Sequence, residues 1–79
     1  MTNSNQNEKL FSDKGEIAFR KALGQRIRKL RIENGMSQTE LGNRLGVSFQ
    51  QIQKYEYGQN WINPYRLKCL MDIFDVPLR

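Results

Sequence analysis

The fold is decided by residues 37–58, Ser-Gln-Thr-Glu-Leu-Gly-Asn-Arg-Leu-Gly-Val-Ser-Phe-Gln-Gln-Ile-Gln-Lys-Tyr-Glu-Tyr-Gly. Ser37 precedes Glu40 by three positions, the pattern of a capping box, in which each side chain bonds the other residue's backbone N–H at the start of a helix. Gly46 follows about two turns later and supplies a stop, because glycine readily takes the left-handed conformation that ends many helices. The first half of the stretch therefore predicts one short helix.

The second half of the stretch repeats these signals. Ser48 precedes Gln51 as a second capping box, and Gly58 supplies the next stop. Only Gly46 and Val47 separate the two predicted helices, which leaves too little chain for anything but a sharp turn. This spacing is typical of a helix-turn-helix.

A longer helical pattern precedes the stretch, beginning near Gly15 and ending at Gly35. Gly24 lies inside this pattern and costs about 1 kcal/mol relative to alanine. It therefore marks either a bend or the real start of the domain's first helix. The apolar residues recur at steps of four, four and three, which indicates one face of a helix: Phe19, Leu23, Ile27 and Leu30.

A last helix follows the stretch. Asn63 is a good N-cap, and Pro64 suits the first helical position. Its apolar stripe consists of Leu67, Leu70, Met71 and Phe74. Since no strand pattern appears, we predict an all-α fold, a small bundle of four to five helices that contains the helix-turn-helix. Residues 1–14 are expected to form a disordered or partly ordered tail, and residues 15–79 the domain.

The composition argues against catalysis. The chain has 79 residues, which allows one small domain with a thin core. It has no histidine and a single cysteine, Cys69. Ser-His or Cys-His nucleophile activation, imidazole metal ligation and multi-cysteine zinc sites are therefore excluded. We predict no catalytic residue, no metal site and no cofactor, and a protein that is not an enzyme.

The charge is basic and concentrated in one segment. Lys and Arg number 13 against 8 Asp and Glu, which gives a net charge of +5 and suits an anionic partner. Residues 20–31 contain no acid and six bases: Arg20, Lys21, Arg26, Arg28, Lys29 and Arg31. No apolar run approaches the roughly 20 residues of a membrane span, and no signal-peptide core is present, so we expect a cytoplasmic protein without membrane contact.

The helix from Ser48 to Tyr57 must divide its faces between core and partner. Ile52 and Tyr55 lie three apart and are expected to face inward. The opposite side then presents Phe49, Gln50, Gln53, Lys54 and Tyr57. A merely solvated face is the alternative, but an outward Phe fits it poorly because burial favours phenylalanine by a few kcal/mol.

The outward side chains suit the edges of DNA bases. A helix about 10–12 Å wide fits a B-DNA major groove roughly 12 Å across. Glutamine matches the N6/N7 edge of adenine, lysine reaches guanine O6/N7, and an apolar ring can meet a thymine methyl group. We therefore predict base contacts from Phe49, Gln50, Lys54 and Gln53.

Candidates for phosphate contacts lie at the helix starts and in the following loop. Gln38 begins a helix, where free backbone N–H groups and the helix dipole favour an anion; ordinary solvation is the alternative. The other candidates are Ser48, Gln51, Asn60 and Asn63. Gln51 either completes the capping box, contacts a phosphate or does both.

Arg31 and Glu56 are expected to form a structural ion pair. Each ends a predicted helix, and their pairing would hold the first helix to the helix-turn-helix. Two unrelated surface charges are the alternative. Trp61, in the loop after Gly58, is expected to be a packing residue and not a base-stacking one.

Residues 24–77 resemble the helix-turn-helix domain of the Cro and phage-repressor type. The resemblance rests on Gly-Gln-Arg-Ile-Arg-Lys-Leu-Arg, on Gly-Met-Ser-Gln-Thr-Glu-Leu-Gly and on the segment from Leu45 to Gly58. Ser-Phe-Gln-Gln-Ile-Gln-Lys-Tyr-Glu is especially similar to short regulators common in alphaproteobacteria. The resemblance implies a phosphate contact for Gln38, base contacts for Phe49, Gln50 and Lys54, and an ion pair between Arg31 and Glu56.

The resemblance also implies a function. We expect a sequence-specific transcriptional regulator, a repressor, that reads double-stranded DNA with the helix from Ser48 to Tyr57. One short helix reads only a few base pairs, so a homodimer on two-fold-related half-sites is expected. The amphipathic stretch from Phe11 to Leu23 is the candidate dimer element, because the minimal domain does not need its apolar residues.

Two other functions compete with this one. The first is an antitoxin-like or adaptor module whose main partner is a protein, bound through the N-terminal residues 1–18. The second is a basic amphipathic helix on a membrane, formed by residues 17–31. The membrane alternative is the weaker one, because the apolar face of that helix is needed for the core.

Overall fold

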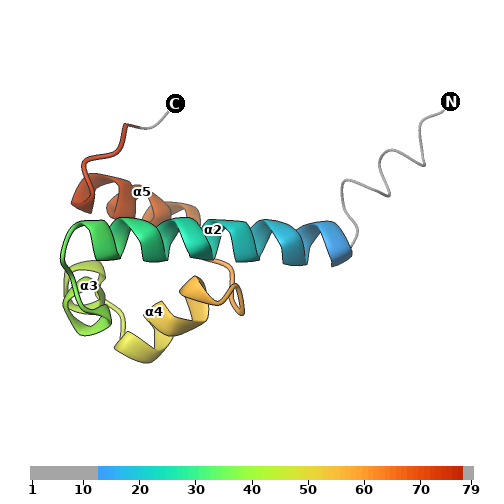
Figure 1. Cartoon of the computed structure of the whole chain (residues 1–79), viewed down its shortest axis with the longest axis horizontal. Helices are drawn as coiled ribbons and strands as arrows, with labels where there is room; N and C mark the ends of the chain where they lie inside the picture. The colour runs from blue at the N-terminus through green and yellow to red at the C-terminus, as the bar shows by residue number, and fades with distance from the viewer. Residues whose placement is uncertain (1–12, 78–79) are drawn as a thin grey trace, which may run out of the picture.

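The computed structural model describes residues 13–77. Within that range there are four α-helices and no strand (Figure 1): α2 (Asp13–Glu33), α3 (Gln38–Leu45), α4 (Phe49–Glu56) and α5 (Pro64–Ile73). The predicted all-α bundle with a helix-turn-helix is confirmed. The first helix begins at Asp13, two residues before the predicted start. Most of the predicted tail and the first two residues of the candidate dimer element, Phe11 and Ser12, lie outside the described residues.

The long helix α2 corrects one prediction. Gly24 marks neither a bend nor a helix start, since α2 runs unbroken through it for 21 residues. A Cβ atom at Gly24 would lie 2.3 Å from the Tyr55 carbonyl oxygen and 2.5 Å from that of Glu56. Real Cβ atoms do not come so close. Glycine at this position therefore lets α2 and the C-terminal end of α4 pack backbone against backbone.

The caps of α3 and α4 follow the predicted pattern in most details. The Ser37 hydroxyl accepts a hydrogen bond from the Glu40 N–H at 3.0 Å, and the Glu40 carboxylate accepts one from the Ser37 N–H at 3.1 Å. Gly46 ends α3 with a φ of 80°. The Ser48 hydroxyl accepts from the Gln51 N–H at 3.1 Å. Gln51 makes no return bond to Ser48, so this capping box is half formed.

The turn between α3 and α4 is held tightly against α3. A Cβ atom at Gly42 would lie 2.6 Å from the Val47 carbonyl oxygen. The absence of that atom lets the turn fold back on the helix it leaves. The start of α4, and hence its direction, is set by this close approach.

The core lies between α3, α4, α5 and the C-terminal half of α2. Leu41 and Ile52 are completely buried at its centre. The other buried apolar residues are Ile27, Leu45, Tyr55, Ile62, Leu70 and Phe74. Full burial of an aliphatic or aromatic side chain stabilises the fold by about 1.5–3 kcal/mol, so this short list carries most of the apolar contribution.

One member of the predicted apolar face of α2 lies outside the core. Ile27 is buried and Leu23 and Leu30 are half-buried, but Phe19 is 59% exposed. Its ring lies 5.8 Å from that of Trp61, which is itself 47% exposed. The reason is that α2 projects beyond the other helices at its N-terminal end (Figure 1), so no core surrounds Phe19.

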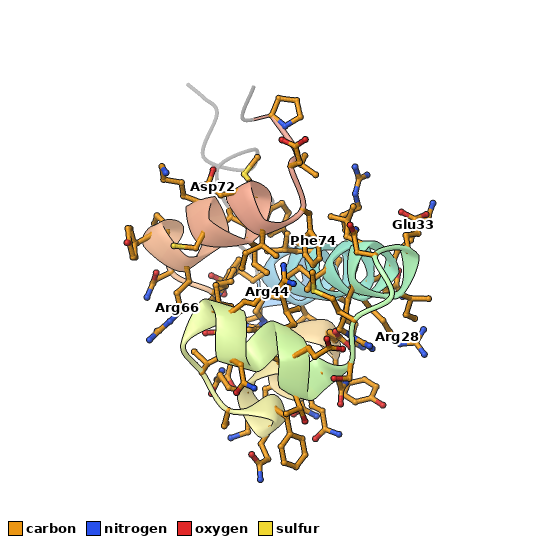
Figure 2. All side chains as sticks on the ribbon, turned by 90° about the vertical axis from the view of Figure 1, so that its left-hand side faces the viewer. Arg28, Glu33, Arg44, Arg66, Asp72 and Phe74 are labelled. Atoms are coloured by element: carbon orange, nitrogen blue, oxygen red, sulfur yellow. The ribbon has the colours of Figure 1, made fainter. Side chains whose placement is uncertain are left out.

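An open apolar groove of about 310 Å³ runs between α2 and α5. Phe74 lies between the two helices at this groove (Figure 2). The groove is lined by Leu23, Arg26, Ile27 and Leu30 of α2, by Leu67, Leu70 and Met71 of α5, and by Phe74 and Val76 after it. The side of α2 that faces α5 is thus less completely filled than the side that faces α4.

Candidate nucleic-acid interface

The helix α4 turns one face to the core and the other to solvent. Ile52 is completely buried and Tyr55 is 5% exposed, as the predicted division of faces requires. On the outward face Phe49, Gln50 and Lys54 are exposed, whereas Gln53 is half-buried. Tyr57 follows the last residue of α4, is 66% exposed and continues this face.

Phe49 is the unusual member of the outward face. It is 44% exposed at the first position of α4, in a small domain that has few apolar side chains to spare for its core. Packing does not account for a phenylalanine placed there. An apolar ring between two polar neighbours on an exposed helix is suited to a partner that offers methyl groups beside hydrogen-bonding atoms.

A buried ion pair fixes α4 to α2. Arg31 Nε lies 2.6 Å from Glu56 Oε2, and Arg31 Nη2 donates to Glu56 Oε1 at 3.1 Å. The remaining guanidinium nitrogen, Nη1, donates to the Met36 carbonyl oxygen at 2.9 Å. Only 2% of the Glu56 side chain is exposed. A carboxylate this deeply buried is tolerated because the guanidinium meets it in a two-point fork.

The same carboxylate also binds α3, a contact that sequence reasoning missed. Gln38 Nε2 donates to Glu56 Oε1 at 3.1 Å. Gln38 is the first residue of α3, so one carboxylate joins α2, α3 and α4. The amide of Gln38 keeps a second N–H, and its backbone N–H belongs to the unpaired first turn of the helix. The predicted phosphate contact would use these two donors and stays a prediction.

Of the other residues predicted to contact phosphate, two serve as helix N-caps and two do not. Ser48 caps α4, and the Asn63 side-chain oxygen caps α5 by accepting from the Arg66 N–H at 2.8 Å. Both caps keep a donor, the hydroxyl hydrogen of Ser48 and the amide nitrogen of Asn63. Gln51 is half-buried and Asn60 is exposed in the loop after α4. Their contacts with phosphate stay predictions.

The loop that follows α4 is anchored to α2 by contacts without a local sequence signal. Arg20 Nε donates to the Gly58 carbonyl oxygen at 3.2 Å, and the Arg20 guanidinium carbon lies 5.4 Å from the centre of the Trp61 ring. Trp61 packs, as expected, but against Phe19 and Arg20 at the surface. These residues are 38 to 42 positions apart, so no spacing in the sequence points to them.

Residues 13–77 hold no grouping of three or more Cys, Asp or Glu side chains that could bind a metal ion. Cys69 is half-buried beside the core. No helix in the described part of the chain has the length and apolar character needed to cross a membrane.

Comparison with known proteins gives a consistent match. The helix-turn-helix family model matches residues 27–79. An uncharacterized HTH-type transcriptional regulator of Sinorhizobium medicae is 50% identical over 56 residues, which cover 71% of this chain and 40% of that protein. An uncharacterized transcriptional regulator in the ATPase CF(0) region of Rhodospirillum rubrum is 46% identical over 56 residues, covering 71% of this chain and 52% of that protein.

The match extends to an archaeon. A putative HTH-type transcriptional regulatory protein of Pyrococcus furiosus is 44% identical over 55 residues, which cover 70% of this chain and 18% of that protein. The chain therefore spans about half or less of the length of these relatives.

Proposed function

This chain belongs to the helix-turn-helix family of transcriptional regulators, and on that premise we propose that it reads specific DNA sequences with α4 lying in the major groove. The observation that supports this most is the outward face of α4. Phe49, Gln50 and Lys54 are exposed on a helix whose opposite face is buried. A helix of 8 residues is about 12 Å long and roughly 10–12 Å wide, which suits the groove.

Each outward side chain has a base edge that it fits. The Gln50 amide can bond adenine N6 and N7 together, and the Lys54 ammonium can donate to guanine O6 and N7. The Phe49 ring can pack against a thymine methyl group. A well-formed two-point contact discriminates against the wrong base by about 1–3 kcal/mol, so these residues are sufficient for a short half-site. Gln53, which is half-buried, is proposed as a supporting contact.

Donors around α4 support contacts with the phosphate backbone. The free donors of Gln38, Ser48 and Asn63 lie at the first turns of α3, α4 and α5, where helix dipoles favour an anion. Gln51 and Asn60 complete the proposed set. Such contacts position the protein on DNA without reading the sequence.

We also propose that the protein acts as a homodimer and represses transcription. One α4 helix contacts too few base pairs for useful specificity, and two half-sites about one helical turn apart are the usual remedy. Phe19, which belongs to the candidate dimer element, forms an exposed aromatic pair with Trp61. A dimer covering an operator can block polymerase without any further surface, and it would act in the cytoplasm. Sedimentation that finds only monomer at tens of micromolar would count against the dimer.

The proposed function is tested by selecting bound sequences from random double-stranded DNA. We expect enrichment of one short half-site in two inverted copies, about 10–11 base pairs between centres. The same selection with the Gln50→Ala variant should return a relaxed preference at one position of each half-site. If the wild-type chain enriches no sequence and shows no salt-sensitive binding, the proposal is wrong.

An antitoxin-like or adaptor module that binds mainly a protein is the second candidate. The observation that favours it is the exposed apolar surface on the projecting end of α2, where Ile17 is 42% and Phe19 is 59% exposed. A stable complex with a protein partner in a pull-down, combined with no shift of any selected DNA, would favour this candidate over the first.

A further inference from the structure

A polar hollow lies between α2 and the C-terminal end of α4. Its volume is about 420 Å³, and it is open to solvent. Lys21, Gln25 and Arg28 of α2 line one wall, and Glu56 and Tyr57 line the other. The wall on α2 is therefore made of donors, two of them cationic.

The three donors share one side of α2 because of helical geometry. Gly24 marks the line along which α2 touches the backbone of α4. At about 100° per residue, Arg28, Lys21 and Gln25 lie roughly 40°, 60° and 100° around the helix from Gly24, all in the same direction. In Figure 2, Arg28 projects from the side of α2 that is turned away from α5.

The hollow carries positive charge that no acidic side chain within residues 13–77 neutralises. Within residues 13–77, neither Lys21 nor Arg28 forms an ion pair. The one carboxylate in the hollow, Glu56, is neutralised by Arg31 and has only 2% of its side chain exposed. Lys21 and Arg28 thus present two cations whose counterions come from the solvent.

The hollow is continuous with the outward face of α4. Tyr57 lines it, is 66% exposed and lies three residues after Lys54, so the two side chains occupy the same side of the helix end. A ligand that runs along the outward face of α4 and past its C-terminal end therefore passes the mouth of the hollow.

The wall on α2 is held in place before any ligand arrives. Arg20 Nε donates to the Gly58 carbonyl oxygen at 3.2 Å, and its guanidinium stacks over Trp61. A Cβ atom at Gly58 would lie 2.8 Å from the Lys21 Cα, so the two backbones touch at this point. The backbone that carries Lys21 is thus fixed relative to the end of α4.

We propose that Lys21, Gln25 and Arg28 of α2, together with the Tyr57 hydroxyl, bind the phosphate backbone of DNA beside the groove that α4 occupies. The inference rests on the proposed function, because it takes the direction of the DNA from α4. Of the residues in this contact, Lys21 and Gln25 precede residue 27, where the family match begins, and Arg28 lies within the matched residues. The contact extends the footprint by one backbone segment.

The test is the salt dependence of binding to the selected operator by the whole chain. Each phosphate neutralised by a cation contributes roughly 0.9 to the slope of log Kd against log salt. The double variant Lys21→Gln/Arg28→Gln should lower that slope by about 1.8 and weaken binding by roughly tenfold or more at about 0.1 M salt. The base preference should stay as in the wild type, because phosphate contacts carry no sequence information.

A matched control removes two charges from other sides of the same helix. Arg26 and Lys29 lie about 160° and 140° around α2 from Gly24, away from α4. The variant Arg26→Gln/Lys29→Gln has the same net charge as the test variant, and it should leave the slope within about 0.3 of the wild type. Thermal unfolding of both variants checks that α2 is intact.

Phosphate ethylation interference separates the possible outcomes. Ethylation of one or two phosphates outside the α4 footprint should block the wild type and have no effect on the Lys21→Gln/Arg28→Gln variant. Identical interference patterns, or an equal loss of slope in the control, would overturn the inference while leaving the proposed function intact. Absence of any DNA binding by the wild type would overturn both.

Discussion

The two sides of α2 are built differently. Towards α4 and the loop that follows it, α2 makes a backbone contact at Gly24, a buried ion pair at Arg31 and a second backbone contact between Lys21 and Gly58. Towards α5, it makes few close backbone approaches and leaves an apolar groove of about 310 Å³. The two neighbouring helices lie on different sides of α2 (Figure 1).

The difference indicates that the distance between α2 and α4 is fixed more closely than the distance between α2 and α5. A backbone contact has no side chain that could shift, and a buried forked ion pair keeps both of its hydrogen bonds only over a narrow range of spacing. Side chains around a groove can shift and repack at small cost. The position of α4 on α2 is therefore fixed closely, whereas the position of α5 is fixed only by the amount of apolar surface it covers.

The most severe way to break the α4 side is Gly24→Ala. The new Cβ would meet two carbonyl oxygens, at 2.3 Å and 2.5 Å, so the helices must separate. We expect a loss of about 4 kcal/mol or more, and a midpoint of thermal unfolding lower by roughly 15–30 °C, measured by circular dichroism. The control Ala22→Gly, at an exposed position of α2, should cost only about 1 kcal/mol. A Gly24→Ala protein as stable as the wild type would contradict the backbone contact.

Removal of Glu56 tests the ion pair on the same side. Glu56→Ala leaves Arg31 buried without its partner, which should cost about 3 kcal/mol in denaturant unfolding. Replacing both residues by methionine should recover part of that loss. The exposed pair of Lys68 and Asp72, at 3.0 Å, is the matched comparison, and Asp72→Ala should leave the midpoint unchanged within error. Equal effects at the two pairs would mean that burial of Glu56 contributes nothing.

Gln50→Ala separates the position of α4 from its chemistry. Gln50 is exposed, so the free energy of unfolding should change by no more than about 0.5 kcal/mol. Binding to the preferred DNA site should weaken by about 1–3 kcal/mol, with relaxed base preference at one position. Gln38→Ala should weaken all sequences evenly, as expected for a phosphate contact. Titrations of a small panel of operators distinguish the two patterns, and an even loss in both variants would refute direct readout by Gln50.

The smallest effect is expected on the α5 side. Leu23→Phe places a larger ring at the open groove, so the free energy of unfolding should stay within about 1 kcal/mol of the wild type. The same enlargement on the α4 side, Ile52→Phe at a completely buried position, should cost about 1–3 kcal/mol. If urea unfolding ranks the two variants in the opposite order, the groove is not the more tolerant side.

The sequence predicts those parts of the fold whose causes are local. Ser37 and Glu40 bond each other across three residues, and Gly46 ends α3 with its own φ of 80°, so these boundaries can be read from neighbours in the chain. The buried and exposed faces of α4 follow in the same way from helical periodicity. The ion pair of Arg31 and Glu56 could be expected because each charge stands at a helix end.

The features that escape prediction depend on contacts between distant segments. Gly24 has no local sign that it lies under α4, and in sequence it reads as a break. Phe19 fits the apolar period of α2 but lies beyond the end of the core, because the period does not tell where the neighbouring helices stop. The Gln38 bond to Glu56 joins residues 18 positions apart, and its side-chain amide could equally have been free.

Because α2 is long and unbroken, a small rotation at its contact with α4 would displace its N-terminal end by a larger distance. From Gly24 to Asp13 the helix is a stiff rod about 17 Å long, and its pivot is the contact with the end of α4. A tilt of α4 by about 5° as it settles into a groove would move the tip of this rod by about 1.5 Å. On the proposed binding mode, a small adjustment of α4 at the DNA would therefore become a larger displacement at Asp13, the far end of α2.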